Sequence, residues 1–252
     1  MKKLLVTLVF LSILLTGCSL FIIEEDTDEY RLLLNEYESY VEGDISNYRG
    51  LKSFINQVTL ETSTASVVLE VKTFDSIGLL VETNYGSGVI VIDGSSYYQI
   101  LTTYELVHQE NNQTTSYKAI DYLGNEYRAT LRFESVEHNL AILRIIKDPS
   151  HSLLALELAS IEPLVGEPVM LIGYQGRVIN AMTLGMIESY TEASETSLRF
   201  MTSRITSDRF GNGGVIINLK HQIAGIQFNS EDNLIYSIAL ETIQDFLKQY
   251  LE

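Results

Sequence analysis

The stretch Gly211-Asn212-Gly213-Gly214-Val215-Ile216-Ile217 decides the fold of this chain, because a glycine-rich turn leads directly into a short aliphatic run. Glycine adopts turn conformations that other residues avoid, and Val and Ile favour strands. Short apolar runs bounded by turn residues recur at 67–71, 78–82, 88–92, 98–102, 127–133, 140–145, 169–172, 181–187, 198–202, 215–217 and 223–228. So many short runs, with only three Pro in the chain, predict an all-β fold of two six-stranded antiparallel β-barrels rather than one sandwich.

The composition supports a folded protein and argues against nucleic acid as a partner. The chain has 252 residues, 46% of them hydrophobic, with 15 Tyr and no Trp. That content is enough to bury a substantial core in one large domain or two small ones. The formal net charge of -16 disfavours binding to phosphate backbones, which needs clustered Lys and Arg.

Two segments carry helical rather than strand periodicity. Residues 240–250 place apolar side chains on one helical stripe, which predicts a closing helix over 239–251. Residues 24–57 repeat apolar residues at spacings of three and four within an acidic background, which predicts one long helix or a helical hairpin. We interpret residues 18–60 as an acidic helical stalk whose charged face is solvated, with docking on a partner as the alternative.

The N-terminus has the pattern of an exported protein. Lys2 and Lys3 precede an apolar run at 4–15 that is too short to span a bilayer. The following Leu15-Thr16-Gly17-Cys18 resembles the bacterial lipobox. The resemblance implies cleavage after residue 17, lipidation of Cys18 and an extracytoplasmic protein anchored to the bacterial cell membrane. The alternative is an uncleaved apolar anchor with an incidental Cys; since Cys18 is the only cysteine, no disulfide can form within the chain.

Residues 64–250 resemble the high-temperature-requirement (Deg-type) branch of the trypsin-like, chymotrypsin-fold serine proteases. Seven fragments occur in the order of that family: A-S-V-V at 65–68, G-S-G-V-I at 86–90, I-L-T-T-Y-E-L-V at 100–107, H-N-L-A-I-L at 138–143, V-G-E-P-V-M-L-I-G at 165–173, T-L-G-M-I at 183–187 and A-G-I at 224–226. Each fragment alone is weak, but their shared order is specific. The resemblance implies a protease domain over 61–252, with a first barrel at about 61–150 and a second at about 151–238.

The same alignment of motifs shows that the three catalytic positions are altered. Where the family has the His, Asp and Ser of its triad, this chain has Glu105, Asn139 and Gly213. The serine of the G-[DN]-S-G-G turn has been lost by substitution at Gly213 or by deletion beside it. An anionic Glu is a poor combined base and acid, an amide does not replace the carboxylate, and Gly offers no nucleophile. We therefore expect no catalytic residue at these positions.

Other residues give no clear replacement for the lost chemistry. The four histidines His108, His138, His151 and His221 are interpreted as structural or surface residues, as are the serines Ser203 and Ser207 that precede the turn. No metal-binding motif is present, and no cofactor is expected. The peptide N–H groups of Gly211 and Gly213 correspond to the oxyanion hole of the family, and they are the candidates for residual recognition of a carbonyl or carboxylate.

These observations favour a lipid-anchored protein with a catalytically inactive trypsin-like domain that binds peptides, unfolded proteins or partner proteins at the cell envelope. Residues 223–228 would form one wall of the binding cleft and pair with an extended peptide. One alternative is an active, divergent serine endopeptidase in envelope protein quality control. Another is a structural surface lipoprotein that binds no peptide. The ligand and the oligomeric state are not set by the sequence.

Overall fold

The computed structural model describes residues 31–32, 35, 49–108, 113–176, 178–192, 198–205, 211–231 and 234–252. The predictions for the signal segment 1–17, for Cys18 and for most of the acidic segment up to residue 48 lie outside these residues. In the described part of the chain, no helix is both long enough and apolar enough to cross a membrane.

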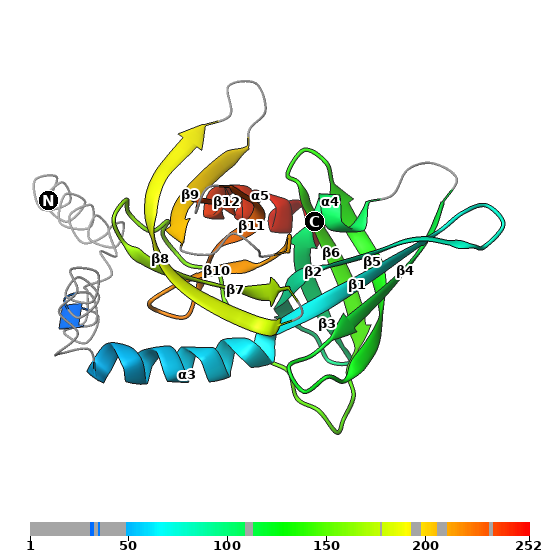
Figure 1. The fold of residues 1–252 in the computed structure, drawn as a ribbon, viewed down its shortest axis with the longest axis horizontal. Coiled ribbons are helices and arrows are strands. Elements are labelled where there is room, and N and C mark those ends of the chain that lie inside the picture. Colours follow the sequence, from blue (N-terminus) through cyan, green and yellow to red (C-terminus); the bar gives the residue numbers. More distant parts are fainter. Residues whose placement is uncertain are drawn as a thin grey trace, which may run out of the picture.

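Two closed, antiparallel, six-stranded barrels make up most of the structure (Figure 1), which confirms the predicted fold class. The first barrel has the strand order β1-β2-β3-β6-β5-β4 and the second β10-β11-β12-β9-β8-β7. The strands of the first barrel are β1 Ser66–Phe74, β2 Leu80–Asp93, β3 Tyr97–Thr103, β4 Thr114–Ile120, β5 Glu126–Ser135 and β6 Leu140–Ile146. Those of the second are β7 Pro168–Gln175, β8 Val178–Glu192, β9 Arg199–Ile205, β10 Val215–Asn218, β11 Ile223–Glu231 and β12 Leu234–Ala239.

The strands differ from the sequence-based runs in three places. Residues 80–82 of the first of these runs and the run at 88–92 belong to one continuous strand, β2, which passes through Gly86 without a turn, and residues 78 and 79 precede this strand. A Cβ at Gly86 would lie 2.6 Å from the carbonyl oxygen of Asn212, so this glycine allows a close approach of two backbones rather than a break. Strands β4 and β12 were not among the predicted runs.

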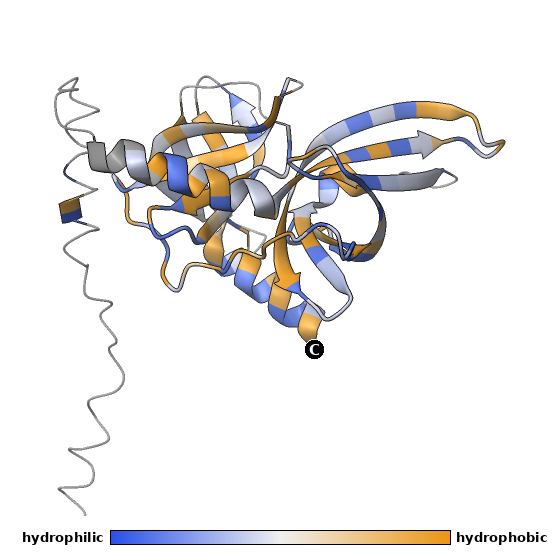
Figure 2. Ribbon diagram, turned by 90° about the horizontal axis from the view of Figure 1, so that it is seen from below, coloured by the Kyte–Doolittle hydropathy of each residue, from blue (hydrophilic) through white to orange (hydrophobic). Residues whose placement is uncertain are grey.

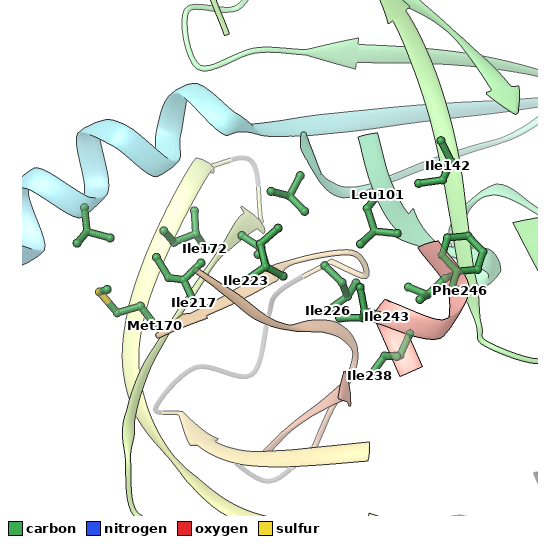
Figure 3. Packing of buried hydrophobic residues seen from close by; sticks show 14 of the residues in the cluster. Leu101, Ile142, Met170, Ile172, Ile217, Ile223, Ile226, Ile238, Ile243 and Phe246 are labelled. Carbon is green, nitrogen blue, oxygen red and sulfur yellow. The ribbon is translucent and has the colours of Figure 1, made fainter. Parts of the chain in front are cut away.

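One hydrophobic cluster joins the two barrels and the C-terminal helix (Figure 3). Leu101 and Ile142 enter it from the first barrel, and Ile172 and Ile226 enter it from the second. Phe246, from helix α5 (Leu240–Leu251), is fully buried between them, with its ring 5.3 Å from that of Phe133 on β5. The predicted C-terminal helix is thus confirmed, and it fixes the barrels against each other.

A second long helix, α3, leads directly into the first barrel (Figure 1). It spans Arg49–Ala65, so it continues beyond residue 60 and ends where β1 begins. Two hydrogen bonds attach its C-terminal half to the second barrel: His221 Nδ1 lies 2.8 Å from Glu61 Oε2, and Asn180 Nδ2 donates to the Ser63 carbonyl at 3.0 Å. The C-terminal half of α3 is therefore attached to the second barrel, and the chain continues directly from it as a strand of the first.

Candidate functional site

Glu105 lies on a single helical turn, α4 (Tyr104–Val107), that follows β3. Leu106 and Val107 are buried and anchor this turn to the first barrel, while Glu105 is exposed. The ring of Tyr104 stacks on that of His108 at 4.3 Å. The carboxylate of Glu105 is therefore presented to solvent from a turn that is fixed on both sides.

Asn139 occupies the turn between β5 and β6 and holds α4 in place. Its backbone has a φ of 50°, in the left-handed region that Asn tolerates better than most residues. Its carbonyl accepts a hydrogen bond from Tyr104 N at 3.0 Å, and its Oδ1 accepts one from Glu105 N at 3.3 Å. The side chain thus has a structural partner in the backbone of α4.

The glycine-rich turn before β10 leaves no room for a side chain at Gly213. This residue has a φ of +88°, and a Cβ there would overlap the carbonyl oxygen of Ser87 and lie 2.5 Å from Thr102 Oγ1. Thr102 itself donates to the Ser87 carbonyl at 2.7 Å, so both obstacles are held in place by a buried hydrogen bond. A serine at position 213 could be accommodated only if the turn or β2 moved.

The backbone of the turn is tied to three strands. Gly213 N donates to the Gln227 carbonyl on β11 at 2.8 Å, and Gly211 N donates to the Tyr174 carbonyl on β7 at 2.9 Å. In the reverse direction, the Asn212 carbonyl accepts from Ser87 N on β2 at 2.7 Å. Both N–H groups that the sequence suggested for an oxyanion hole are therefore engaged, and in this conformation neither is free to bind a ligand carbonyl.

The structure brings the three altered positions together. Asn212, next to Gly213, directs its Nδ2 toward Glu105 Oε2 at 3.5 Å, and Glu105 N is bonded to Asn139. Turns from both barrels meet at this point, as the resemblance implied. They form a chain of amide and carboxylate contacts that contains no hydroxyl and no imidazole.

The other candidate side chains have partners elsewhere or are inaccessible. His138 Nδ1 lies 2.8 Å from Ser135 Oγ, His221 binds Glu61, and His108 Nδ1 lies 3.9 Å from Glu134 Oε1. Ser203 lies on β9 with no exposed surface, and Ser207 lies outside the described residues. None of these contacts places a histidine beside the turn at Gly213.

A serine, a histidine and an aspartate do meet in the segment after β6, but their geometry is not that of a catalytic triad. Ser150 Oγ donates directly to Asp148 Oδ1, and His151 faces both of these side chains with the same atom, Nδ1. In a working triad, the imidazole lies between the two groups and uses both of its nitrogens. The hydrogen bonds from the Ser150 hydroxyl and N–H, with that of His151, lower the pKa of Asp148 to about 2. The aspartate thus stays ionised and keeps the hydroxyl proton directed at itself, in a local turn motif.

Nothing in the described ranges suggests a metal centre, because no three His, Cys, Asp or Glu side chains gather there as ligands. The lowered pKa of one carboxylate in the first barrel, Asp121, has a structural cause. Burial raises the pKa of Asp121, but hydrogen bonds from the Asn125 side chain and backbone, the Tyr127 hydroxyl and the Leu123 N–H outweigh it and lower the pKa. These bonds close the turn between β4 and β5.

Comparison with protein families identifies a related domain. The family model described as a trypsin-like peptidase domain matches residues 86–226, which is more than half of the chain. The match runs from β2 to β11 and includes all three altered positions. No curated protein matches the chain.

Proposed function

We propose that this chain, which belongs to the family of trypsin-like peptidase domains, is a member that does not hydrolyse peptides and instead binds an extended segment of a partner protein. The observation that carries the first half of this proposal is the turn at Gly213. In this family of reactions a hydroxyl must attack the carbonyl, and removal of the nucleophile alone costs about 10⁶ in turnover. Here the position has neither a hydroxyl nor space for one.

The second half rests on the pairing of β11. From Gly225 to Gln227 this strand is bonded on both sides, to β12 and to β10 or its preceding turn, and Ile223 exchanges backbone hydrogen bonds with Glu157 and Ala159. The expectation that the whole of 223–228 could receive a peptide therefore does not fit. Beyond Gln227, Asn229 and Glu231 pair with β12, and among the described residues no strand is paired with these two on the other side.

An extended peptide can add to β11 beside Asn229 and Glu231 without any catalytic group. Strand addition draws its affinity from main-chain hydrogen bonds, and the side chains of the peptide then contact the neighbouring surface. Phe228 and Phe200 lie beside this segment with their ring centroids 5.1 Å apart. They offer an aromatic surface to an apolar side chain of the bound peptide.

We place this activity at the outer face of a bacterial membrane, in a member of the Deg-type branch. The lipobox-like Leu15-Thr16-Gly17-Cys18 supports lipid anchoring, and the ordered series of Deg-like fragments supports the branch. Two or more acyl chains on Cys18 would give stable attachment. Unfolded or extended segments of envelope proteins would then be the partners that can reach β11.

Binding to a reduced and alkylated, permanently unfolded protein, and to peptides derived from it, tests the proposal. We expect saturable binding that is weakened by N-methylation of alternate peptide residues on one edge, because these amides would face β11. The same number of N-methyl groups on the other edge is the matched control and should leave binding nearly unchanged. Absence of saturable binding would favour a structural lipoprotein, and equal effects of both methylation patterns would exclude strand addition.

A further inference from the structure

The hairpin that joins β1 to β2 carries a cluster of exposed aliphatic residues at its end. Figure 1 shows this hairpin extending outward from the first barrel, and Figure 2 shows that its end is hydrophobic. Four residues form what we call the apolar tip: Ile77, Leu79, Leu80 and Val81, with exposed fractions of 78%, 62%, 55% and 56%. Such side chains cost free energy in water when they are left uncovered.

The exposure of the tip does not alternate along the chain. Every residue at 76–82 is exposed. Along residues 126–130 of β5, by contrast, exposed residues alternate with buried ones, because one face of β5 covers the core. A docking surface on a sheet presents one face to its partner. The apolar tip instead presents aliphatic carbon on all sides, which suits an apolar medium that surrounds it.

Internal hydrogen bonds already engage the N–H groups of Ile77, Gly78 and Leu79 at the end of the hairpin. Asp75 Oδ1 accepts from Ile77 N at 3.0 Å and from Leu79 N at 2.8 Å. The Asp75 carbonyl accepts from Gly78 N at 3.0 Å, and Asp75 N donates to the Leu79 carbonyl at 2.9 Å. A turn closed in this way loses less on leaving water than a turn whose N–H groups depend on solvent.

The charges around the tip point to the kind of surface that it can enter. Between residues 73 and 83 the only charged side chains are Asp75 and Glu82, both acidic. The next base, Lys72, lies 2.8 Å from Glu70 Oε1 and is paired. An anionic surface would therefore repel the tip, and the net charge of -16 also opposes burial of the tip in a second copy of the chain.

We propose that the apolar tip inserts into the interface of a phospholipid bilayer of low net charge. Aliphatic side chains at a membrane surface are buried to a depth of about 5–10 Å, a depth that a protruding turn can reach while the barrel stays in water. The insertion provides a membrane contact that is separate from any lipid on Cys18. It orients the first barrel relative to the membrane.

The absence of Trp from the chain makes this proposal directly measurable. In the full chain, Leu79→Trp places the only tryptophan in the tip. Leu123→Trp is the matched control, because Leu123 is also 62% exposed, lies in another turn of the same barrel and has its N–H bonded to an aspartate, Asp121. Each variant is mixed with phosphatidylcholine vesicles with and without brominated acyl chains.

We expect the emission of the tryptophan at position 79 to shift to the blue on vesicles and to be quenched by the brominated chains, with neither effect at position 123. Ile77→Ser in the Leu79→Trp background should lower the quenched fraction, and Ile77→Trp alone should reproduce the signal of Leu79→Trp. Equal behaviour of positions 79 and 123 overturns the proposal. A blue shift at position 79 that is already complete without vesicles also overturns it, because the tip would then be covered by protein.

Discussion

The two barrels differ in the space that they leave for side chains at the altered site. In the first barrel, Asn139 still holds the start of α4 through its side chain, and Glu105 stands on an exposed helical turn with space around it. In the second barrel, the turn at Gly213 is packed against Ser87 and Thr102 so closely that a Cβ cannot be added. The first barrel leaves Glu105 exposed, where other side chains would fit, while the second leaves no space for a side chain at Gly213.

Under the proposed function, this difference shows which half of the site would more strongly resist the introduction of a catalytic side chain. A change of Glu105 or Asn139 alters chemistry at positions that other side chains can occupy. A serine at position 213, by contrast, would first have to displace the β2 backbone at Ser87. Restoring all three residues therefore should not restore hydrolysis unless the turn is also rebuilt.

Among the substitutions described here, Gly213→Ser should lower the stability of the protein most. The left-handed backbone and the overlap with Ser87 together should lower the free energy of unfolding by about 3–5 kcal/mol. Gly166→Ser is the control, because Gly166 has nearly the same φ, +89°, with no atom within 4 Å of a Cβ. It should lose only about 1–2 kcal/mol from backbone strain. Urea unfolding measures both, and equal losses would show that the turn is not crowded.

A smaller effect is expected at Asn139 in the first barrel. Asn139→Ala loses the hydrogen bond to Glu105 N and places Ala at a φ of 50°, and it should cost about 2 kcal/mol. Asn139→Gly loses the same hydrogen bond but adopts this φ without strain, so it should cost about 1 kcal/mol. Asn139→Asp keeps the acceptor and should unfold at nearly the urea concentration of the parent. If Asn139→Asp were as destabilised as Asn139→Ala, the bond to α4 would not be the function of this side chain.

Acid provides a test of the first barrel that leaves the turn at Gly213 unchanged. The pKa of Asp121 is lowered in the folded state, so its contribution to stability is present above its unfolded pKa of about 3.9 and is lost as the pH falls through the folded value. Asp121→Asn should cost about 1 kcal/mol at pH 7. The difference in urea midpoint between Asp121→Asn and the parent protein should shrink below about pH 4. A difference that stays constant with pH would show that the charge of the Asp121 carboxylate does not stabilise the fold.

The smallest effect is expected for Glu105 itself. Its contact with Asn212 is 3.5 Å long and exposed, so Glu105→Gln should change the free energy of unfolding by less than about 0.5 kcal/mol. A matched substitution at the exposed Glu82 provides the scale for a residue outside the site. If Glu105→Gln lowered the free energy of unfolding clearly more than the substitution of Glu82, the stability of the first barrel would depend on the carboxylate of Glu105.

The sequence predicted the architecture better than the details of the site. Short Val- and Ile-rich runs predicted the two barrels, and the ordered fragments predicted that turns carrying Glu105, Asn139 and Gly213 would meet. Strand β4 was missed because it begins with Thr114-Thr115-Ser116 and contains Lys118, so it lacks the apolar signal of a strand. Strand β12 was missed although Leu234, Tyr236 and Ile238 alternate within it.

The state of the turn could not be predicted, because it depends on contacts between residues far apart in the chain. The N–H of Gly213 is bonded to Gln227, and the space beside Gly213 is occupied by Ser87 and Thr102. No local pattern reports such distances. Likewise, the sequence pattern gives two separate apolar runs at 78–82 and 88–92, whereas β2 runs continuously through Gly86, which packs against Asn212.

Reaction of the purified full chain with a fluorophosphonate probe shows whether any serine of this protein acts as a catalytic nucleophile. If the protein does not hydrolyse peptides, as we propose, we expect no covalent labelling at concentrations of the probe that label an active trypsin-like protease completely. Labelling that disappears when one serine, such as Ser150 or Ser203, is replaced by Ala would contradict it.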